Sequence, residues 1–430
     1  MKILTSLREL EEKVIDYYFN SGDFNGISIS NLIDELSITF LDLSILLSRG
    51  IEEDRLRVTS SDFEMNPHII RQGFPDKLQQ LSAIKEDNIH HTCVYPSKSL
   101  AKAKLSSEQW SDSPFKRMLA EGIGQLEIIF FDLELLDFYR RDPRYFYECN
   151  DIGGRICIKD DYYLSESTQE KDKILLKAFG IAYDDDFNRY LAAFVSDVAD
   201  LSQEHQNIWK SKLVEEQLKV HPDFYGSQIL GRWPTHISVF DAVLYEQKII
   251  NAMVNKIGKP NLFKSEFGKY LESKPQEFAF LLRPTIQEYE SFIHLLDKIM
   301  SDNINKKFFK GELHLEQEIE RRDGKVQVVP KGTIQLLDEW LRKNYNSTDW
   351  SPWDFAISVF KKIRKQRQSP AHSITENKYD KSLVQEQRGL MQEVYEALMI
   401  LRHALSNHPL CKDYDFDIPQ ALIEGKIWMV

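Results

Sequence analysis

The sequence predicts a mainly α protein in three parts, residues 1–75, 76–275 and 276–430. Along most of the chain, apolar residues recur at the three- and four-residue spacing of amphipathic helices. The alternation that is typical of strands is confined to short segments. A chain of 430 residues is also too long for one small domain and long enough to bury a large core.

Composition and charge exclude several classes of protein. The chain is 42% hydrophobic and 28% charged, as globular proteins are and disordered chains are not. Its formal net charge of −12 argues against a protein that coats nucleic acid through bulk positive charge. No apolar run is long enough to span a membrane, and the first residues have the pattern of an amphipathic helix and not of a signal peptide. We therefore expect a cytoplasmic protein without membrane contact, whose four scattered cysteines stay reduced.

The first part combines short helices with a small strand region. Apolar spacing predicts helices over residues 4–20 and 39–49 and a shorter one over 30–36, and the alternation at 55–58 predicts a strand. Three helices followed by a β-ribbon resemble a winged helix-turn-helix, and the usual role of that fold is DNA binding.

The charge of this part argues against that role. Residues 1–71 carry seven Lys or Arg against thirteen Asp or Glu, and the only cation on the expected recognition helix is Arg49. Because affinity for DNA needs several phosphate-neutralising cations, we expect no binding to duplex DNA. Protein docking or dimerisation is the favoured role.

The middle part is predicted to be mostly helical with one small hairpin. Long amphipathic helices are expected over residues 115–140 and 187–215, and a hairpin is expected to turn at 151–154. No phosphate-binding loop or zinc motif is present, so neither a metal nor a cofactor is expected. The run Asp184–Asp186 could ligate a divalent ion, but a carboxylate run in a loop is usually solvated surface and is interpreted so. His90, His91 and Cys93 lie close enough to suggest a metal site, yet no fourth ligand follows at a matching spacing.

The last part is predicted to be a helical bundle with an inserted β-hairpin. The hairpin is expected to turn at Asp323–Gly324. Helices are expected to start at Pro284, at Thr333, at Ser351–Pro352 (ending near Ser369) and at about Asp380 (ending at Ser406).

The densest basic cluster of this acidic chain lies at the junction of the last two helices. The segment KKIRKQRQSPAH, residues 361–372, places five cations in seven positions, and His372 follows Arg367 after four intervening residues. An arginine, a polar residue and a histidine in this arrangement at a helix junction resemble the HEPN superfamily. Members of that superfamily include metal-independent ribonucleases of toxin-antitoxin and phage-defence systems. The resemblance covers residues 280–408, and Gln368 stands where many relatives have Asn.

Two alternatives remain open for the motif. Arg402 and His408 fit the same pattern at the far end of the last helix, although the junction context favours the first pair. Arg367 and His372 also have a purely structural interpretation, in which the arginine pairs with a nearby carboxylate and the histidine caps a helix. Ile363 precedes Arg367 by four residues, so Arg367 is expected to face a packed or interfacial surface.

The resemblance implies a metal-independent endoribonuclease that cleaves single-stranded RNA, with Arg367 and His372 as its catalytic residues. The ribose 2′-hydroxyl is the nucleophile in such a reaction, so the protein must supply a proton acceptor, a proton donor and a cation for the phosphate. One motif supplies only one histidine, and we therefore expect a homodimer with two motifs at one phosphate. The residues expected to contact the flanking RNA are Lys361, Arg364, Lys365 and Gln368.

The resemblance also implies a biological role as a toxin or an antiviral defence effector, with an antitoxin or defence-system protein as a possible partner. The alternative is a non-catalytic adaptor or regulatory protein with a winged helix and a HEPN-like binding bundle.

Overall fold

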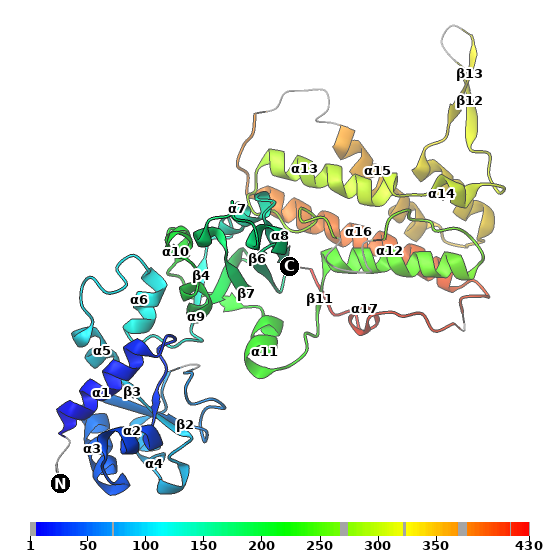
Figure 1. The fold of residues 1–430 in the computed structure, drawn as a ribbon. Coiled ribbons are helices and arrows are strands. Elements are labelled where there is room, and N and C mark those ends of the chain that lie inside the picture. Colours follow the sequence, from blue (N-terminus) through cyan, green and yellow to red (C-terminus); the bar gives the residue numbers. More distant parts are fainter. Residues whose placement is uncertain are drawn as a thin grey trace. The chain divides into compact units, whose positions relative to one another are not determined.

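The computed structural model describes residues 6–70, 73–266, 274–320, 324–368, 376–412 and 414–429 (Figure 1). The chain divides into two compact units. The first comprises Met1–Phe146 and Arg155–Val220, and the second comprises Tyr147–Gly154 and His221–Val430. The boundary at residue 220 lies inside the predicted middle part, and the predicted division at residues 75 and 275 remains a prediction.

The fold is mixed α/β, so the prediction of a mainly α protein is wrong. The difference arises mainly in residues 115–220, where long helices were expected and a seven-stranded sheet is found. Its strands run in the order β5-β6-β7-β8-β4-β9, and β10 pairs with β7. The strands are β4 (Ile128–Phe131), β5 (Tyr145–Cys149), β6 (Gly153–Ile158), β7 (Leu175–Tyr183), β8 (Arg189–Phe194), β9 (Leu213–Val214) and β10 (Lys219–Val220).

Two features explain why the helix expected over residues 115–140 does not form. Helix α6 (Pro114–Ala120) ends two residues before Gly122, whose positive φ of 86° suits a residue without a side chain. Four consecutive apolar residues then form β4, and such a run cannot be assigned to helix or strand from its periodicity alone. The expected helix over 187–215 is likewise replaced by β8, α9 (Val195–Ala199), α10 (Gln203–Lys210) and β9. The remaining helices of this region are α7 (Leu135–Arg141) and α8 (Asp160–Tyr163).

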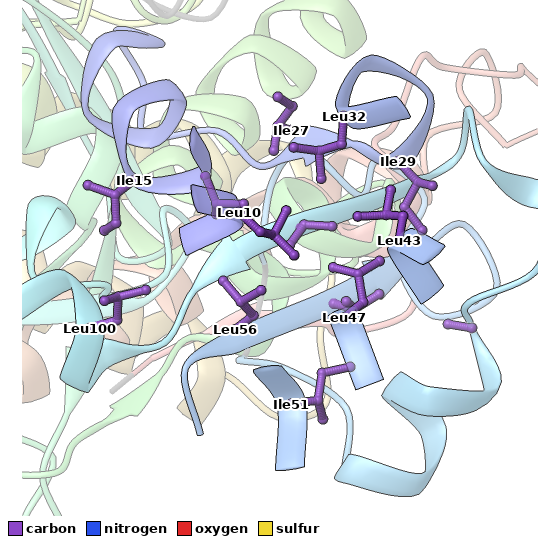
Figure 2. Close-up of a cluster of buried hydrophobic side chains, with 14 of the residues drawn as sticks. Leu10, Ile15, Ile27, Ile29, Leu32, Leu43, Leu47, Ile51, Leu56 and Leu100 are labelled. Carbon is purple, nitrogen blue, oxygen red and sulfur yellow. The ribbon is translucent and has the colours of Figure 1, made fainter. Parts of the chain in front are cut away.

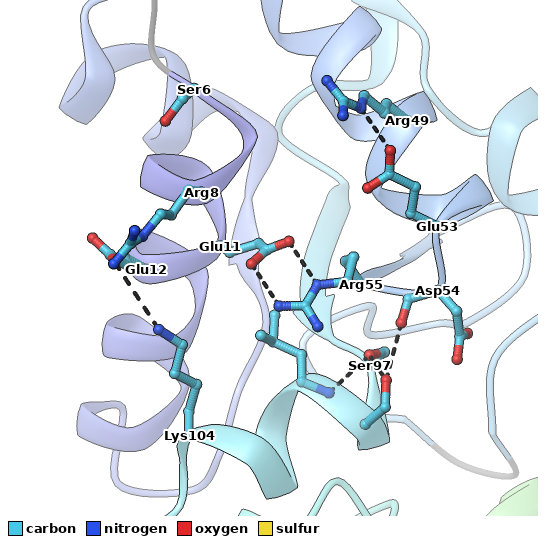
Figure 3. Close-up of polar contacts among 12 residues, drawn as sticks. Ser6, Arg8, Glu11, Glu12, Arg49, Glu53, Asp54, Arg55, Ser97 and Lys104 are labelled. Carbon is cyan, nitrogen blue, oxygen red and sulfur yellow. Dashed lines mark hydrogen bonds and ion pairs between the residues drawn. The ribbon is translucent and has the colours of Figure 1, made fainter.

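The N-terminal region contains the expected helices and a small antiparallel sheet in the order β1-β3-β2. Its buried side chains form one hydrophobic core, to which α1, α2, α3 and all three strands contribute (Figure 2). A bidentate pair between Arg55 and the nearly buried Glu11, with both contacts at 2.8 Å, ties the start of β2 to α1 (Figure 3). The elements are α1 (Leu7–Asn20), β1 (Ile27–Ser28), α2 (Ile29–Leu36), α3 (Phe40–Glu52), β2 (Leu56–Ser60), α4 (Lys77–Ser82), β3 (Thr92–Pro96) and α5 (Lys98–Lys104).

The second unit is built on long helices. Helix α12 packs along α16, α16 along α15, and α15 along α13. The last two long helices begin and end within about two residues of their predicted limits. The helices are α11 (Pro222–Leu230), α12 (Val239–Lys256), α13 (Ile286–Asp297), α14 (Thr333–Asn344), α15 (Ser351–Gln368), α16 (Ser382–Ser406) and α17 (Gln420–Ile423).

Two small sheets complete the second unit. Strands β11 (Ile237–Ser238) and β14 (Ile427–Trp428) pair in parallel. The inserted hairpin consists of β12 (Glu316–Glu320) and β13 (Val326–Pro330), which pair in antiparallel fashion as expected. Asp323 of its predicted turn lies outside the described residues. Across the described ranges, no helix combines the length and the apolar character needed to cross a membrane.

Candidate functional site

Arg367 lies in the last turn of α15 and faces the packed interior of the second unit. Its neighbour one turn earlier, Ile363, is fully buried. The Nη1 of Arg367 donates to Oδ2 of Asp297 at 2.6 Å and to Oδ2 of Asp302 at 2.7 Å. Arg367 thus faces a packed surface, as its spacing from Ile363 predicts, and it makes the carboxylate pairing that the structural interpretation requires.

Arg364 belongs to the same network. Its Nη2 donates to Oδ1 of Asp302 at 2.7 Å, and its Nε lies 3.2 Å from Oδ1 of Asp297. Two guanidinium groups therefore face two carboxylates, and the four charges cancel. Because the side chain of Asp297 is completely buried, its charge depends on these partners.

A π turn brings the two carboxylates together. Residues Lys298–Asp302 form this turn directly after α13, so Asp297 and Asp302 bracket it. In an α-helix, residues five apart point about 140° away from each other, since each residue turns the helix by about 100°. The i to i+5 hydrogen bonding of a π turn places them on nearly the same side, where both reach α15.

The network favours the charged forms of Asp302 and Arg367. Partial burial raises the pKa of Asp302, but hydrogen bonds from Arg364 and Arg367 outweigh this effect and lower the pKa overall. Hydrogen bonds to Asp297 and Asp302 raise the pKa of Arg367, so its guanidinium stays charged. The guanidinium of Arg367, at the end of α15, is therefore charged and held in one orientation.

The other cations of the basic cluster differ in their availability. Lys362 is bound to Glu393, with Nζ–Oε distances of 2.7 and 2.9 Å. Lys361 and Lys365 are exposed and make no ion pair within the described ranges. Gln368 is exposed as the last residue of α15. Of the three lysines of this cluster, Lys361 and Lys365 are therefore the better able to bind a phosphate.

The second half of the motif, His372, lies outside the described residues, as do Ser369, Pro370 and Ala371. The structure thus places Arg367 and the residues around it, and the pairing of Arg367 with His372 remains a prediction.

The competing pair, Arg402 and His408, is held in local structure. The Nε of Arg402 donates to Oε2 of the buried Glu246 on α12 at 2.6 Å. The Nδ1 of His408 accepts from the backbone N–H of Leu410 at 3.2 Å, in the turn that follows α16. Both side chains therefore have structural partners, as Arg367 does, and the preference for the first pair remains a prediction.

Comparison with protein-family models, curated proteins and solved structures finds no match.

The two groups considered as metal sites have other partners in the structure. Asp184 closes the turn between β7 and β8, where its carboxylate accepts from the backbone of Asp186 and Asn188. Cys93 is buried in β3, and its Sγ lies 3.5 Å from Nδ1 of His68. Within the described residues, no group of three or more His, Cys, Asp or Glu is arranged to hold a metal ion.

Sequence reasoning missed the acidic half of the site, Asp297 and Asp302. One signal was present: Asp297 lies four residues after Ile293, on the apolar face of the predicted helix. An acidic residue on a buried face needs a cationic partner, and Arg364 and Arg367 were the candidates on a neighbouring helix. No signal pointed to Asp302, because its placement depends on the π turn.

Proposed function

We propose that this protein is a metal-independent endoribonuclease of HEPN type that cleaves single-stranded RNA at the end of α15. One observation carries the proposal, namely the way in which Arg367 is held. Two carboxylates fix its Nη1, while its Nε and Nη2 have no partner among the described residues. A guanidinium that is already oriented, with donors left over, is suited to stabilise charge on a phosphate without reorganising during the reaction.

The chemistry divides between the two residues of the motif. The 2′-hydroxyl attacks the adjacent phosphorus, and the bond to the 5′-oxygen of the next nucleotide breaks. His372 accepts the hydroxyl proton or protonates the leaving oxygen, and Arg367 binds the phosphate oxygens. A second copy supplies the other histidine. Lys361, Arg364, Lys365 and Gln368 contact the flanking RNA, and Arg364 also pairs with the two carboxylates that hold Arg367.

A cleavage assay in chelator tests this proposal. We expect the full chain to cleave mixed RNA in excess EDTA and to leave 2′,3′-cyclic phosphate ends, because the ribose hydroxyl and not water attacks. His372→Ala should reduce the rate at least ~10²-fold, the lower end for loss of one acid–base group. His408→Ala is the matched control and should cleave at nearly the wild-type rate.

Three outcomes would contradict the proposal or part of it. Cleavage that requires added metal would exclude this mechanism. Cleavage that survives His372→Ala and is lost with His408→Ala would move the site to the other pair. A protein that light scattering shows to be monomeric while it cleaves RNA would contradict the composite site.

The second candidate function is that of an adaptor, and the exposed face of α3 favours it. Leu41 and Ile45, one turn apart, are 68% and 61% exposed. Arg49, the only cation on this helix, is engaged with Glu53 at 2.7 Å (Figure 3). An apolar, cation-poor surface suits a protein partner better than a phosphate backbone.

We therefore expect the full chain not to bind duplex DNA through α3. In about 0.15 M salt, a DNA duplex should show no shift in mobility that depends on Arg49, since one engaged cation cannot replace the several that duplex affinity requires. The measurement compares the wild type with Arg49→Glu. A strong, salt-sensitive shift that disappears in Arg49→Glu would refute this expectation and restore the DNA-binding role.

The proposal also includes a biological role and a partner. A ribonuclease of this type would act in the cytoplasm as a toxin or an antiviral effector, and an antitoxin or defence-system partner would restrain it. The N-terminal region, with its exposed apolar face on α3, is the part of the chain best suited to receive such a partner.

A further inference from the structure

The β12–β13 hairpin stands out from the helices of the second unit (Figure 1). It is a two-stranded sheet, joined by five consecutive residue pairs from Glu316↔Pro330 to Glu320↔Val326. Among the described residues, no third strand pairs with it. Two-stranded hairpins are marginally stable in water unless further strands or a packed face support them.

The base of the hairpin is joined by two hydrogen bonds. The backbone N–H of Lys331 donates to the carbonyl of Leu315 at 2.8 Å. The side chain of Gln317 accepts from Gln335 of α14, also at 2.8 Å. The first bond extends the pairing of the two strands by one residue pair, and the second connects the start of β12 to α14. The residue pairs farther out are mostly exposed.

One face of the hairpin is apolar along one strand and acidic along the other. Paired residues of antiparallel strands point to the same face, so Val326 and Val328 lie beside Glu320 and Glu318. The valines are 61% and 56% exposed. Exposed apolar residues on an edge strand favour association with another strand, and folded proteins usually avoid them.

The two strands of the hairpin differ in charge, and this difference determines which free edge can pair with another strand. Strand β12 carries Glu316, Glu318 and Glu320 at alternate positions, which repel another acidic strand. Strand β13 reads Val-Gln-Val-Val-Pro and carries no charge. Natural edge strands avoid unwanted pairing with charges or proline, so β12 is protected along its whole length, whereas β13 has such a residue only at its last position, Pro330.

We propose that β13 pairs in antiparallel fashion with β13 of a second copy of this chain, about a two-fold axis near Val328. The four strands then form one sheet, with the acidic β12 strands on the outside and the uncharged strands in the centre. A second copy fits because the strand that it offers is itself uncharged and β-branched, whereas pairing through β12 would set like charges against each other. The proposal concerns how copies associate, and it does not depend on whether the chain cleaves RNA.

Cysteine cross-linking of the full chain tests the pairing. Val326, Val328 and Val329 are each replaced by Cys, and each variant is oxidised and run on a non-reducing gel. Facing residues of antiparallel strands have Cα atoms about 4.5–5.5 Å apart, within the range that a disulfide spans. We expect a covalent dimer from the position nearest the axis. Glu318→Cys on β12 is the matched control, and it should give no more dimer than the wild type, which reports the background from the four native cysteines.

The dissociation constant of the dimer provides a second test. Val328→Lys places two cations against each other at the axis and should raise the dissociation constant of the dimer at least ~10-fold in sedimentation, whereas Glu318→Gln should not. Val328 is half exposed, so neither change threatens folding. Equal cross-linking from β12 and β13, no cross-link from β13, or an unchanged constant in Val328→Lys would overturn the proposal. If the Val328→Lys variant is monomeric and still cleaves RNA, this result supports pairing through β13 and contradicts only the ribonuclease site shared between two copies.

Discussion

Arg402→Ala is expected to lower the free energy of unfolding by about 3–5 kcal/mol near neutral pH, the range seen when one partner of a buried ion pair is removed. Glu246, its partner on α12, is fully buried, and the Nε–Oε2 distance is 2.6 Å. Without the arginine, a carboxylate would remain in the interface between α12 and α16 with no opposing charge. Urea unfolding, followed by circular dichroism, measures the loss.

The loss should depend on pH in a defined direction. Burial raises the pKa of Glu246 above its ordinary value even though Arg402 acts to lower it. Removing Arg402 raises this pKa further. A carboxyl whose folded-state pKa lies above its unfolded-state pKa favours folding at low pH, and this contribution is lost as pH rises through the folded-state pKa. The difference between Arg402→Ala and the wild type should therefore be smaller at pH 5 than at pH 8.

Two further variants identify the cause. Arg342→Ala, in an exposed pair with Asp338 and Asp354, should cost no more than about 1 kcal/mol, because water screens such pairs. The double variant Glu246→Leu/Arg402→Met should recover most of the stability, since apolar residues of similar size often replace a buried pair without loss. If Arg402→Ala costs no more than Arg342→Ala, the buried pair does not carry the stability assigned to it.

The helices that could be predicted best are the longest ones. Helices α15 and α16 have apolar positions at helical spacing over 18 and 25 residues, and prolines or turn residues mark their limits. In the middle region the same reasoning misread a strand as a helix, because β4 is four apolar residues long and its neighbours happened to continue a helical spacing. Strand pairing between distant segments, such as β4 with β8, has no local signal.

The candidate site was predictable to a similar degree. The basic cluster and the inward direction of Arg367 follow from residue type and spacing. The partners of Arg367 do not, because they depend on which helix packs against α15 and on a π turn that shifts the register of Asp302. A pattern read at the α-helical period cannot show such a turn.

Arg367→Ala is expected to reduce the rate of RNA cleavage at saturating RNA at least ~10²-fold, if Arg367 stabilises the charge on the reacting phosphate as proposed. The difficulty in interpreting this variant is that Arg367 also neutralises Asp297 and Asp302. Loss of activity alone would not distinguish chemistry from a disturbed network.

Arg364→Ala is the matched control for this reason. Arg364 contacts the same two carboxylates from one turn earlier in α15, so each variant leaves Asp297 and Asp302 with a single guanidinium that they share. Their losses of unfolding free energy should be similar. Arg364→Ala should weaken the apparent affinity for RNA, and the rate at saturating RNA should change little.

Arg367→Lys separates the two roles further. A lysine keeps the positive charge beside Asp297 and Asp302, and should recover much of the stability, but it lacks the planar fork of donors that binds a phosphate through two atoms. We expect Arg367→Lys to fold nearly as well as the wild type and to cleave almost as slowly as Arg367→Ala. Equal rates for Arg364→Ala and Arg367→Ala, or full cleavage by Arg367→Lys, would show that Arg367 serves the ion-pair network and not the phosphate. The adaptor function would then be the better account of this chain.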